Sequence, residues 1–259
     1  MSVTAGRIPV VSAVNRFLEY AGGLAVMLLD VCKNIVTLKV RPVEVIRQAY
    51  FLGVQSWPIV VLTSLFTGLV ISLEAASSAV SYGLSQFVGG SVAFGEVREL
   101  GPMLTGIVFA GRAGAAITAS LGSMVVTEQI EALQSMGVSP VKVLVTPRVL
   151  AALVTVPMLT VFADIVGVYG GFYMARLRAH LSSYTYWHSV QTSIGFDDVY
   201  KGLIKAAVFG MLVGLVGCYE GFRAQGGAEG VGRVTTHAVV TAIILIFAFN
   251  FALSFVLFP

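Results

Sequence analysis

The feature that most constrains this chain is its series of long apolar segments. A helix needs about 20 apolar residues to cross the hydrocarbon core of a bilayer, and five segments of the 259-residue sequence come near or beyond that length. Hydrophobic residues make up 57% of the chain and charged residues 11%, which is too little charge to coat a soluble globule. We therefore predict an all-α integral membrane protein with five transmembrane helices, at 57–80, 98–126, 149–175, 202–222 and 237–258.

The N-terminal segment, residues 1–50, has a different pattern. Residues 17–38 are apolar, but Glu19, Asp30 and Lys33 interrupt the run. Apolar residues recur there at three- and four-residue spacing on one face: Phe17, Ala21, Leu24, Leu28, Cys32 and Ile35. Such a stripe is typical of an interfacial helix that lies in the membrane surface. The alternative is a true first span whose polar residues face a bundle. Either way, residues 1–259 form one domain, with the five-span bundle at 57–258.

The segments between the spans are short. Residues 83–97 are glycine-rich and too short to span, so we expect a brief excursion on the far side of the membrane. The longest polar stretch, 176–201, is expected to be an outer loop. The fourth span carries glycines at the spacing that permits close helix packing: Gly210 with Gly214, and Gly217 with Gly221.

Basic residues predict the orientation, because they favour the cytoplasmic side of a membrane. With a cytoplasmic N-terminus, the inner segments hold ten of them: Arg7, Arg16, Lys33, Lys39, Arg41, Arg47, Lys142, Arg148, Arg223 and Arg233. The outer segments hold four: Arg98, Arg176, Arg178 and Lys201. Five spans then place the C-terminus outside.

Charged residues inside the predicted spans need a physical explanation, since each costs about 2.5–3.5 kcal/mol or more when unpaired. Glu99, beside Arg98, is expected either to line a polar cavity or to be stabilised by a helix dipole at a helix start. Small residues flank Arg112, which we expect to brace a helix contact. Asp164 and Lys205 are expected to be structural.

Residues 127–137 predict a short amphipathic helix on the cytoplasmic side. Its expected parts are a capping Thr127, the first-turn residues Glu128, Gln129 and Glu131, an apolar side of Ile130, Leu133 and Met136, and a terminating Gly137. Such a helix is either a connector resting on the membrane or a knob that docks into a partner and passes force to the flanking spans.

The sequence lacks the motifs of several classes of function. No lysine follows a glycine, so the chain contains no G-x-x-x-x-G-K loop for ATP, and zinc-protease and nucleophile-elbow motifs are missing as well. Two isolated cysteines and three scattered histidines indicate no disulfide framework and no metal site. The small net charge of +3 does not suggest nucleic acid as a partner. We therefore expect no catalytic residues.

Two stretches resemble the MlaE/YrbE permease family. The first is 98–152, which begins RELGPM and contains FAGRAG and TEQIEALQSMG; the second is 218–240, CYEGFRAQGGAEGVGRVTTHAVV. The resemblance implies the permease subunit of an ABC transporter in the bacterial inner membrane, homodimeric or paired. It also implies a separate cytoplasmic ATPase that binds the ATP, often a small STAS-domain subunit, and a periplasmic MCE-domain protein that carries phospholipid between inner and outer membranes. No cofactor is implied for the permease itself.

The resemblance also implies roles for particular residues. The helix at 127–137 would be the coupling helix held by the ATPase, and Tyr82, Arg98 and Glu99 would lie near the lipid head group. Ser120 and Asn250 stand where the family commonly has carboxylates, which removes two candidate ionic partners for Arg112.

Two other functions remain as alternatives. One is a self-sufficient secondary carrier or channel for a small or amphipathic solute, driven by ion flow through Glu99, Asp164 and Lys205. The other is a structural anchor for a peripheral complex. Transport by the chain alone, without nucleotide, would favour the first, and the absence of a bound lipid would favour the second.

Overall fold

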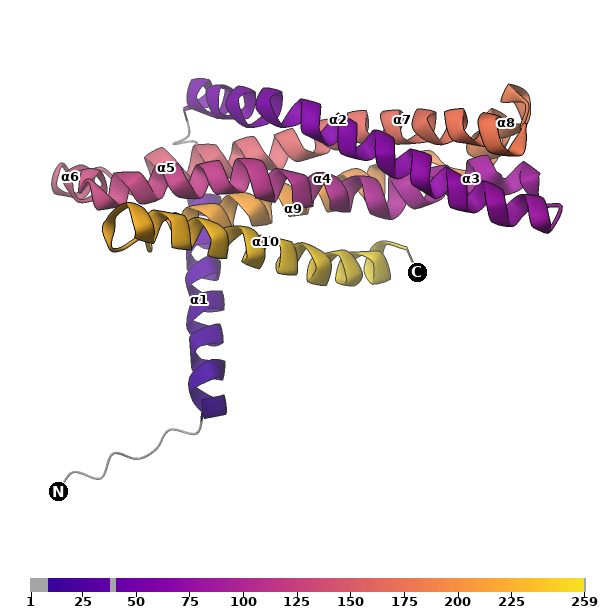
Figure 1. Cartoon of the computed structure of the whole chain (residues 1–259). Coiled ribbons are helices and arrows are strands. Elements are labelled where there is room, and N and C mark those ends of the chain that lie inside the picture. Colours follow the sequence, from indigo (N-terminus) through magenta and orange to yellow (C-terminus); the bar gives the residue numbers. More distant parts are fainter. Residues whose placement is uncertain (1–8, 38–40, 259) are drawn as a thin grey trace.

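The computed structural model describes residues 9–37 and 41–258, and it is helical throughout them apart from short turns. Within these residues, five helical passes are long and apolar enough to cross a bilayer, which confirms the predicted number: Pro42–Ala79, Ser85–Val126, Val141–Ala179, Phe196–Gly221 and Gly227–Leu257. Figure 1 shows the passes side by side, with the short helix α6 (Gln129–Ser135) at one end of the bundle and the C-terminus toward the other.

The passes differ in how regular they are. The first is the single helix α2 (Pro42–Ser81), and the fourth and fifth are α9 (Phe196–Gly221) and α10 (Gly227–Leu257). The third joins the π-helical turn η4 (Val141–Val145) to α7 (Thr146–Ala179). The second is the most broken, and consists in order of η1 (Ser85–Phe87), α3 (Val88–Gly95), η2 (Glu96–Leu100), α4 (Gly101–Phe109), η3 (Ala110–Gly114) and α5 (Ala115–Val126), of which η2 and η3 are π-helical turns.

The N-terminal helix α1 (Pro9–Val36) lies across the bundle at a steep angle to the passes (Figure 1). Met27 and Val31 are buried in the main core, and Asn34 donates to the Thr146 hydroxyl at 3.2 Å. This direction agrees with the interfacial interpretation. Leu24 and Leu28 of the predicted stripe pack against this core, whereas Cys32 and Ile35 are exposed and the fully buried positions are Met27 and Val31. The residues Arg7 and Lys39 and the side chains of Arg16 and Phe17 lie outside the described part.

The packing of α2 against α7 depends on small residues four positions apart. A Cβ added to Gly68 would lie 1.9 Å from the Gly167 carbonyl oxygen, so only glycine permits this approach. One turn further along, the Ser72 hydroxyl donates to the Gly171 carbonyl at 2.7 Å. Small residues that bring two backbones together are the usual means of helix association in a membrane.

All five passes begin earlier in the chain than predicted, and three segments need particular correction. The first pass begins at Pro42. Pro58, which the sequence predicts near the start of a helix, lies inside α2. A membrane helix tolerates proline where neighbouring groups compensate for the lost hydrogen bond. Residues 83–97 are not a separate loop, because from Ser85 they are helical and continue directly into the second pass. The stretch 176–201 is mostly helical and includes α8 (Ser183–Ser193). Gly89 explains the second error, because a Cβ there would lie 2.5 Å from the Tyr186 carbonyl oxygen of α8.

The glycines of α9 pack as predicted. A Cβ on Gly210 would lie 2.4 Å from the Ala152 carbonyl oxygen of α7, and a Cβ on Gly221 would lie 2.8 Å from the Leu121 side chain of α5. These contacts hold α9 in the middle of the bundle, where it can supply side chains to the polar network described next.

Candidate functional site

A polar network lies inside the bundle where η2 meets α9 and α10. The local cause is a proline. Pro102, in the first turn of α4, has no N–H to donate to the Arg98 carbonyl four residues earlier. That carbonyl oxygen accepts instead from the Lys205 ammonium of α9 at 2.8 Å. The π-helical turn and the proline together therefore leave the Arg98 carbonyl oxygen available to a charged side chain. Turns of this kind are frequent at functional sites.

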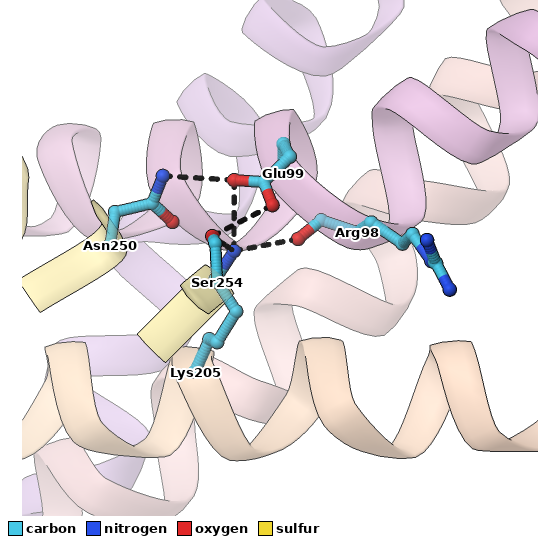
Figure 2. A network of polar contacts seen from close by, with 5 residues as sticks. All are labelled: Arg98, Glu99, Lys205, Asn250 and Ser254. Carbon is cyan, nitrogen blue, oxygen red and sulfur yellow. Dashed lines mark hydrogen bonds and ion pairs between the residues drawn. The ribbon is translucent and has the colours of Figure 1, made fainter. Parts of the chain in front are cut away.

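Glu99 is the centre of this network, as Figure 2 shows. Its Oε2 lies 2.9 Å from Lys205 Nζ and accepts from the Asn250 amide at 2.9 Å, and its Oε1 accepts from the Ser254 hydroxyl at 2.8 Å. The Lys205 side chain is 0% exposed, whereas that of Glu99 is 39% exposed. The Lys205 ammonium is thus fully enclosed by the protein, whereas the Glu99 carboxylate is accessible to solvent or to a ligand.

The Arg98 side chain turns away from Glu99 (Figure 2). Its Nε and Nη2 both lie 2.7 Å from Asp198 Oδ1 at the start of α9, and the guanidinium lies 4.3 Å from the ring centres of Phe94 and Phe258. A guanidinium has five N–H donors, so these two contacts leave donors for a further anion. Arg98 is partly exposed.

The structure brings two of the three residues predicted at the head group together and leaves the third apart. Arg98 and Glu99 are neighbours on η2. Tyr82 lies in the turn after α2 with its side chain 78% exposed, and no hydrogen bond or ion pair between described residues joins it to either of them.

Sequence reasoning missed most of the network. The sequence predicts Lys205 as a structural charge, or as part of an ion path with Glu99 and Asp164, but not as the ion-pair partner of Glu99. Asp198, Asn250 and Ser254 are not among the predicted site residues. The opposite charges of Glu99 and Lys205 in two spans were a usable signal, but the residues are 106 positions apart and spacing gave no guide to their pairing. The amide of Asn250 donates to Glu99, so the neutral residue fits a site whose acceptor is already a carboxylate.

Arg112 and Asp164, predicted to be structural, lie elsewhere. Arg112 Nη1 donates to the Phe51 carbonyl oxygen at 3.3 Å, and its guanidinium lies 5.4 Å from the Phe51 ring centre, so it joins η3 to α2. Asp164 is buried on α7. Ser120 contacts Arg148, not Arg112, with 3.5 Å between Oγ and Nη2.

The short helix α6 has the position expected of a projecting knob, at one extreme of the bundle (Figure 1). The predicted cap is wrong. Glu128 precedes the helix in the left-handed conformation with φ 60°, while the Thr127 hydroxyl donates back to the Ser123 carbonyl at 2.8 Å. Gly137, with φ +73°, follows the end of the helix as predicted.

The faces of α6 are unequal. Ile130 is buried and Leu133 half-buried against the spans, which agrees with the predicted apolar side. Met136 does not share this side, because α6 ends at Ser135 and the Met136 side chain is 68% exposed. Gln129 and Glu131 are exposed as well. A protein partner therefore meets a mixed polar and apolar surface here.

The sequence is similar to those of several known proteins. A family model described as Permease MlaE matches residues 45–256. The chain is 39% identical over 214 residues to a probable ABC transporter permease protein of Rickettsia typhi, covering 83% of each chain. It is 33% identical over 214 residues to the intermembrane phospholipid transport system permease protein MlaE of Haemophilus influenzae, covering 82% of each. It is also 33% identical over 234 residues to the chloroplastic protein TRIGALACTOSYLDIACYLGLYCEROL 1 of Arabidopsis thaliana, covering 90% of this chain and 67% of that one.

Proposed function

The chain belongs to the MlaE permease family, and from this premise we propose that it moves phospholipid between the bacterial inner membrane and a periplasmic MCE-domain carrier. It is the multi-pass permease subunit of an ABC transporter and not itself an enzyme. ATP is bound and hydrolysed by a separate ATPase, so the permease needs no cofactor of its own. By this transport the protein contributes to lipid homeostasis of the outer membrane.

The polar network of η2 supports a head-group site. A phospholipid carries an anionic phosphate, and the free donors of Arg98 suit it. The partly exposed Glu99 suits a positively charged or hydroxyl group beside the phosphate. Apolar spans surround the network, as acyl chains require. The observation that carries the proposal is this pairing of a reachable Arg98 and Glu99 within a membrane pass of an MlaE-family permease.

Force from the ATPase is proposed to enter through α6. The exposed residues Gln129 and Glu131 of α6, and Met136 directly after it, would contact the ATPase, and the buried Ile130 would pass the movement to α5 and η4 on either side. Thr127, Glu128, Leu133 and Gly137 would shape this coupling segment. The complete transporter is proposed to contain a second permease copy and, beside the ATPase and the MCE-domain protein, a STAS-domain subunit.

The head-group proposal is tested with the purified complex and mass spectrometry of its bound lipid. Arg98→Gln removes the free donors and is expected to lower both the phospholipid content and ATP-driven lipid transfer, with the ATPase still present. Arg176→Gln, an exposed arginine of α7, is the matched control. Unchanged lipid content and transfer in Arg98→Gln would contradict the site. Transfer by the permease alone, without nucleotide, would instead support an ion-driven carrier.

The coupling proposal is tested by charge reversal on α6. Glu131→Arg is expected to lower the amount of ATPase that co-purifies and to lower ATP-driven lipid transfer. Glu229→Arg, an exposed reversal at the start of α10 near the same end of the bundle, is the control and is expected to retain both (Figure 1). Full co-purification and full transfer in Glu131→Arg would contradict a docking role for α6.

A further inference from the structure

Two carboxyl groups are buried together away from the Glu99 network. Glu96 of η2 is 0% exposed and Asp164 of α7 is 9% exposed. Each lies against a glycine beside the other: a Cβ on Gly167, one turn after Asp164, would lie 2.3 Å from Glu96 Oε1, and a Cβ on Gly101 would lie 1.9 Å from Asp164 Oδ1. The two glycines therefore make the space in which both acids are held.

The hydrogen-bond contacts around Glu96 indicate that its carboxyl group carries a proton. The Ser64 hydroxyl of α2 lies 2.8 Å from Glu96 Oε1 and also contacts the Ala163 carbonyl oxygen. A hydroxyl has one proton to donate, and a carbonyl oxygen only accepts. If Ser64 donates to Ala163, its contact with Glu96 is a hydrogen bond only when Glu96 carries a proton. If Ser64 donates to Glu96, two oxygen atoms meet with no hydrogen between them.

The remaining oxygens point to the same conclusion. Glu96 Oε2 and Asp164 Oδ1 are buried and have no hydrogen-bond partner among the described residues. The charged and titratable groups on neighbouring elements are engaged elsewhere: Arg98 binds Asp198, Lys205 binds Glu99, Lys201 lies over the Phe258 ring, and Tyr186 of α8 donates to the Val168 carbonyl. Two ionised carboxylates would thus lie at the same buried junction with no cation among the described residues to balance them, which is strongly unfavourable.

We propose that Glu96 and Asp164 form a proton-binding site that holds at least one proton at neutral pH and, while neutral, fastens α2, η2 and α7 together. A proton fits this space better than a metal ion, because Ca²⁺ or Mg²⁺ requires six or more oxygen ligands, and the described residues contain no group of three or more metal-ligating acids, histidines or cysteines. Loss of the proton would create repulsion at the junction and loosen η2, the turn that carries Arg98 and Glu99.

The site has a route for proton exchange. A cavity of ≈380 Å³ reaches Asp164 from the side of α8. It is lined mainly by apolar residues, with Gln191 among its polar members. Asp164 is therefore the member of the pair that can exchange a proton with the surroundings, and Glu96 is the member that keeps one through Ser64.

Infrared spectroscopy of the purified full-length protein tests the proposal. A protonated carboxyl has a C=O stretching band that is separate from the bands of ionised carboxylates. At neutral pH the wild type is expected to show this band, and the double variant Glu96→Gln/Asp164→Asn is expected to lose it. Ser64→Ala is expected to shift the band, because the proton loses its acceptor. Glu74→Gln, an exposed carboxyl of α2, is expected to leave it unchanged.

A pH series of thermal unfolding provides the second measurement. As the pH rises through deprotonation of the pair, the unfolding midpoint of the wild type is expected to fall, and the double variant is expected to lack this fall. If the double variant does not fold, the wild type alone decides the question. Loss of the protonated-carboxyl band as the pH is raised, together with a fall in the unfolding midpoint over the same pH range, supports the site. A wild type without the band at neutral pH would overturn the proposal, as would an undiminished band in the folded double variant.

Discussion

At the scale of single residues, the ion pair of Glu99 and Lys205 is unequal. The Lys205 ammonium is enclosed by Glu99, the Arg98 carbonyl and the Ser254 hydroxyl, and no part of its side chain is exposed. Glu99 keeps contact with its surroundings and has the Asn250 amide as a further donor. A charge that remains buried without its counter-ion costs far more than one that can be solvated.

We therefore predict that removing Glu99 destabilises the protein more than removing Lys205. Glu99→Ala leaves the ammonium buried and is expected to cost about 3 kcal/mol. Lys205→Met keeps most of the volume and leaves a partly exposed carboxylate, with an expected cost of about 1 kcal/mol. Thermal unfolding midpoints in detergent measure the order. The double variant Glu99→Gln/Lys205→Met serves as the reference, and equal or reversed losses would disprove the inequality.

Arg148 offers a second prediction at this scale. It is buried, donates to the Leu144 carbonyl at 2.9 Å and contacts the Ser120 hydroxyl at 3.5 Å, and it shares with Ser120 a cavity of ≈300 Å³. Ser120→Glu places a carboxylate beside the guanidinium, so we expect stabilisation of about 1.5 kcal/mol. The unfolding midpoint measures it. Ser123→Glu, at an exposed position of the same helix, is the control, and no gain over that control would refute the pairing.

At the scale of elements, α6 is held between two left-handed residues, Glu128 and Gly137. Glycine adopts this conformation without cost, but a glutamate does not, because its Cβ approaches the following carbonyl oxygen. The strain at Glu128 lies at the hinge between α5 and α6, where the proposed coupling movement would have to pass. Backbone strain of this kind is often found at functional positions.

Relieving that strain gives the third prediction. Glu128→Gly is expected to raise stability by about 1 kcal/mol, and Glu128→Asn by less, since asparagine tolerates the left-handed conformation better than most residues. Glu131→Gly, inside α6, is expected to lower stability by about 1 kcal/mol. Unfolding midpoints of the three variants measure these changes. A loss of stability in Glu128→Gly would be inconsistent with a strained left-handed Glu128.

The same elements show what sequence could and could not predict. The five passes and the glycine contacts of α9 followed from length, hydropathy and spacing, which are local. The course of α3 did not, because Gly89 resembles a loop residue until its contact with Tyr186 is known. The partners of Glu99 likewise lie on α9 and α10, and nothing within η2 specifies them. Pairings between distant segments were therefore the part that required the fold.

At the scale of the whole molecule, an odd number of passes separates α6 from the C-terminal end (Figure 1). The helix α8 lies at the end opposite α6. The proposed mechanism requires α6 on the cytoplasmic side, where ATP is available. It also requires Arg98 and Glu99 to lie nearer the periplasmic side, where the MCE-domain carrier would receive the lipid. Orientation in the membrane is thus the property on which the transport proposal depends most.

Cysteine labelling gives the fourth prediction. In a Cys32→Ser background, which leaves only the buried Cys218, Met136→Cys and Tyr184→Cys place single thiols on exposed positions at opposite ends. A membrane-impermeant maleimide added to cells with a permeabilised outer membrane is expected to label position 184 directly. Position 136 should react only after the inner membrane is opened. The reverse pattern would exclude a cytoplasmic ATPase docked on α6.

The π-helical turns of the second pass limit how the gene for such a protein can evolve. Each turn holds one residue more than an α-helical turn, so deletion of a single codon within Ala110–Gly114 would close η3 into an α-helical turn and leave the faces of α4 and α5 nearly unchanged. Deletion of a codon within the regular helix α4 (Gly101–Phe109) would instead rotate η2 by about 100° relative to α5 and turn Glu99 away from Lys205. Loss of one codon should accordingly be tolerated better within η3 than within α4.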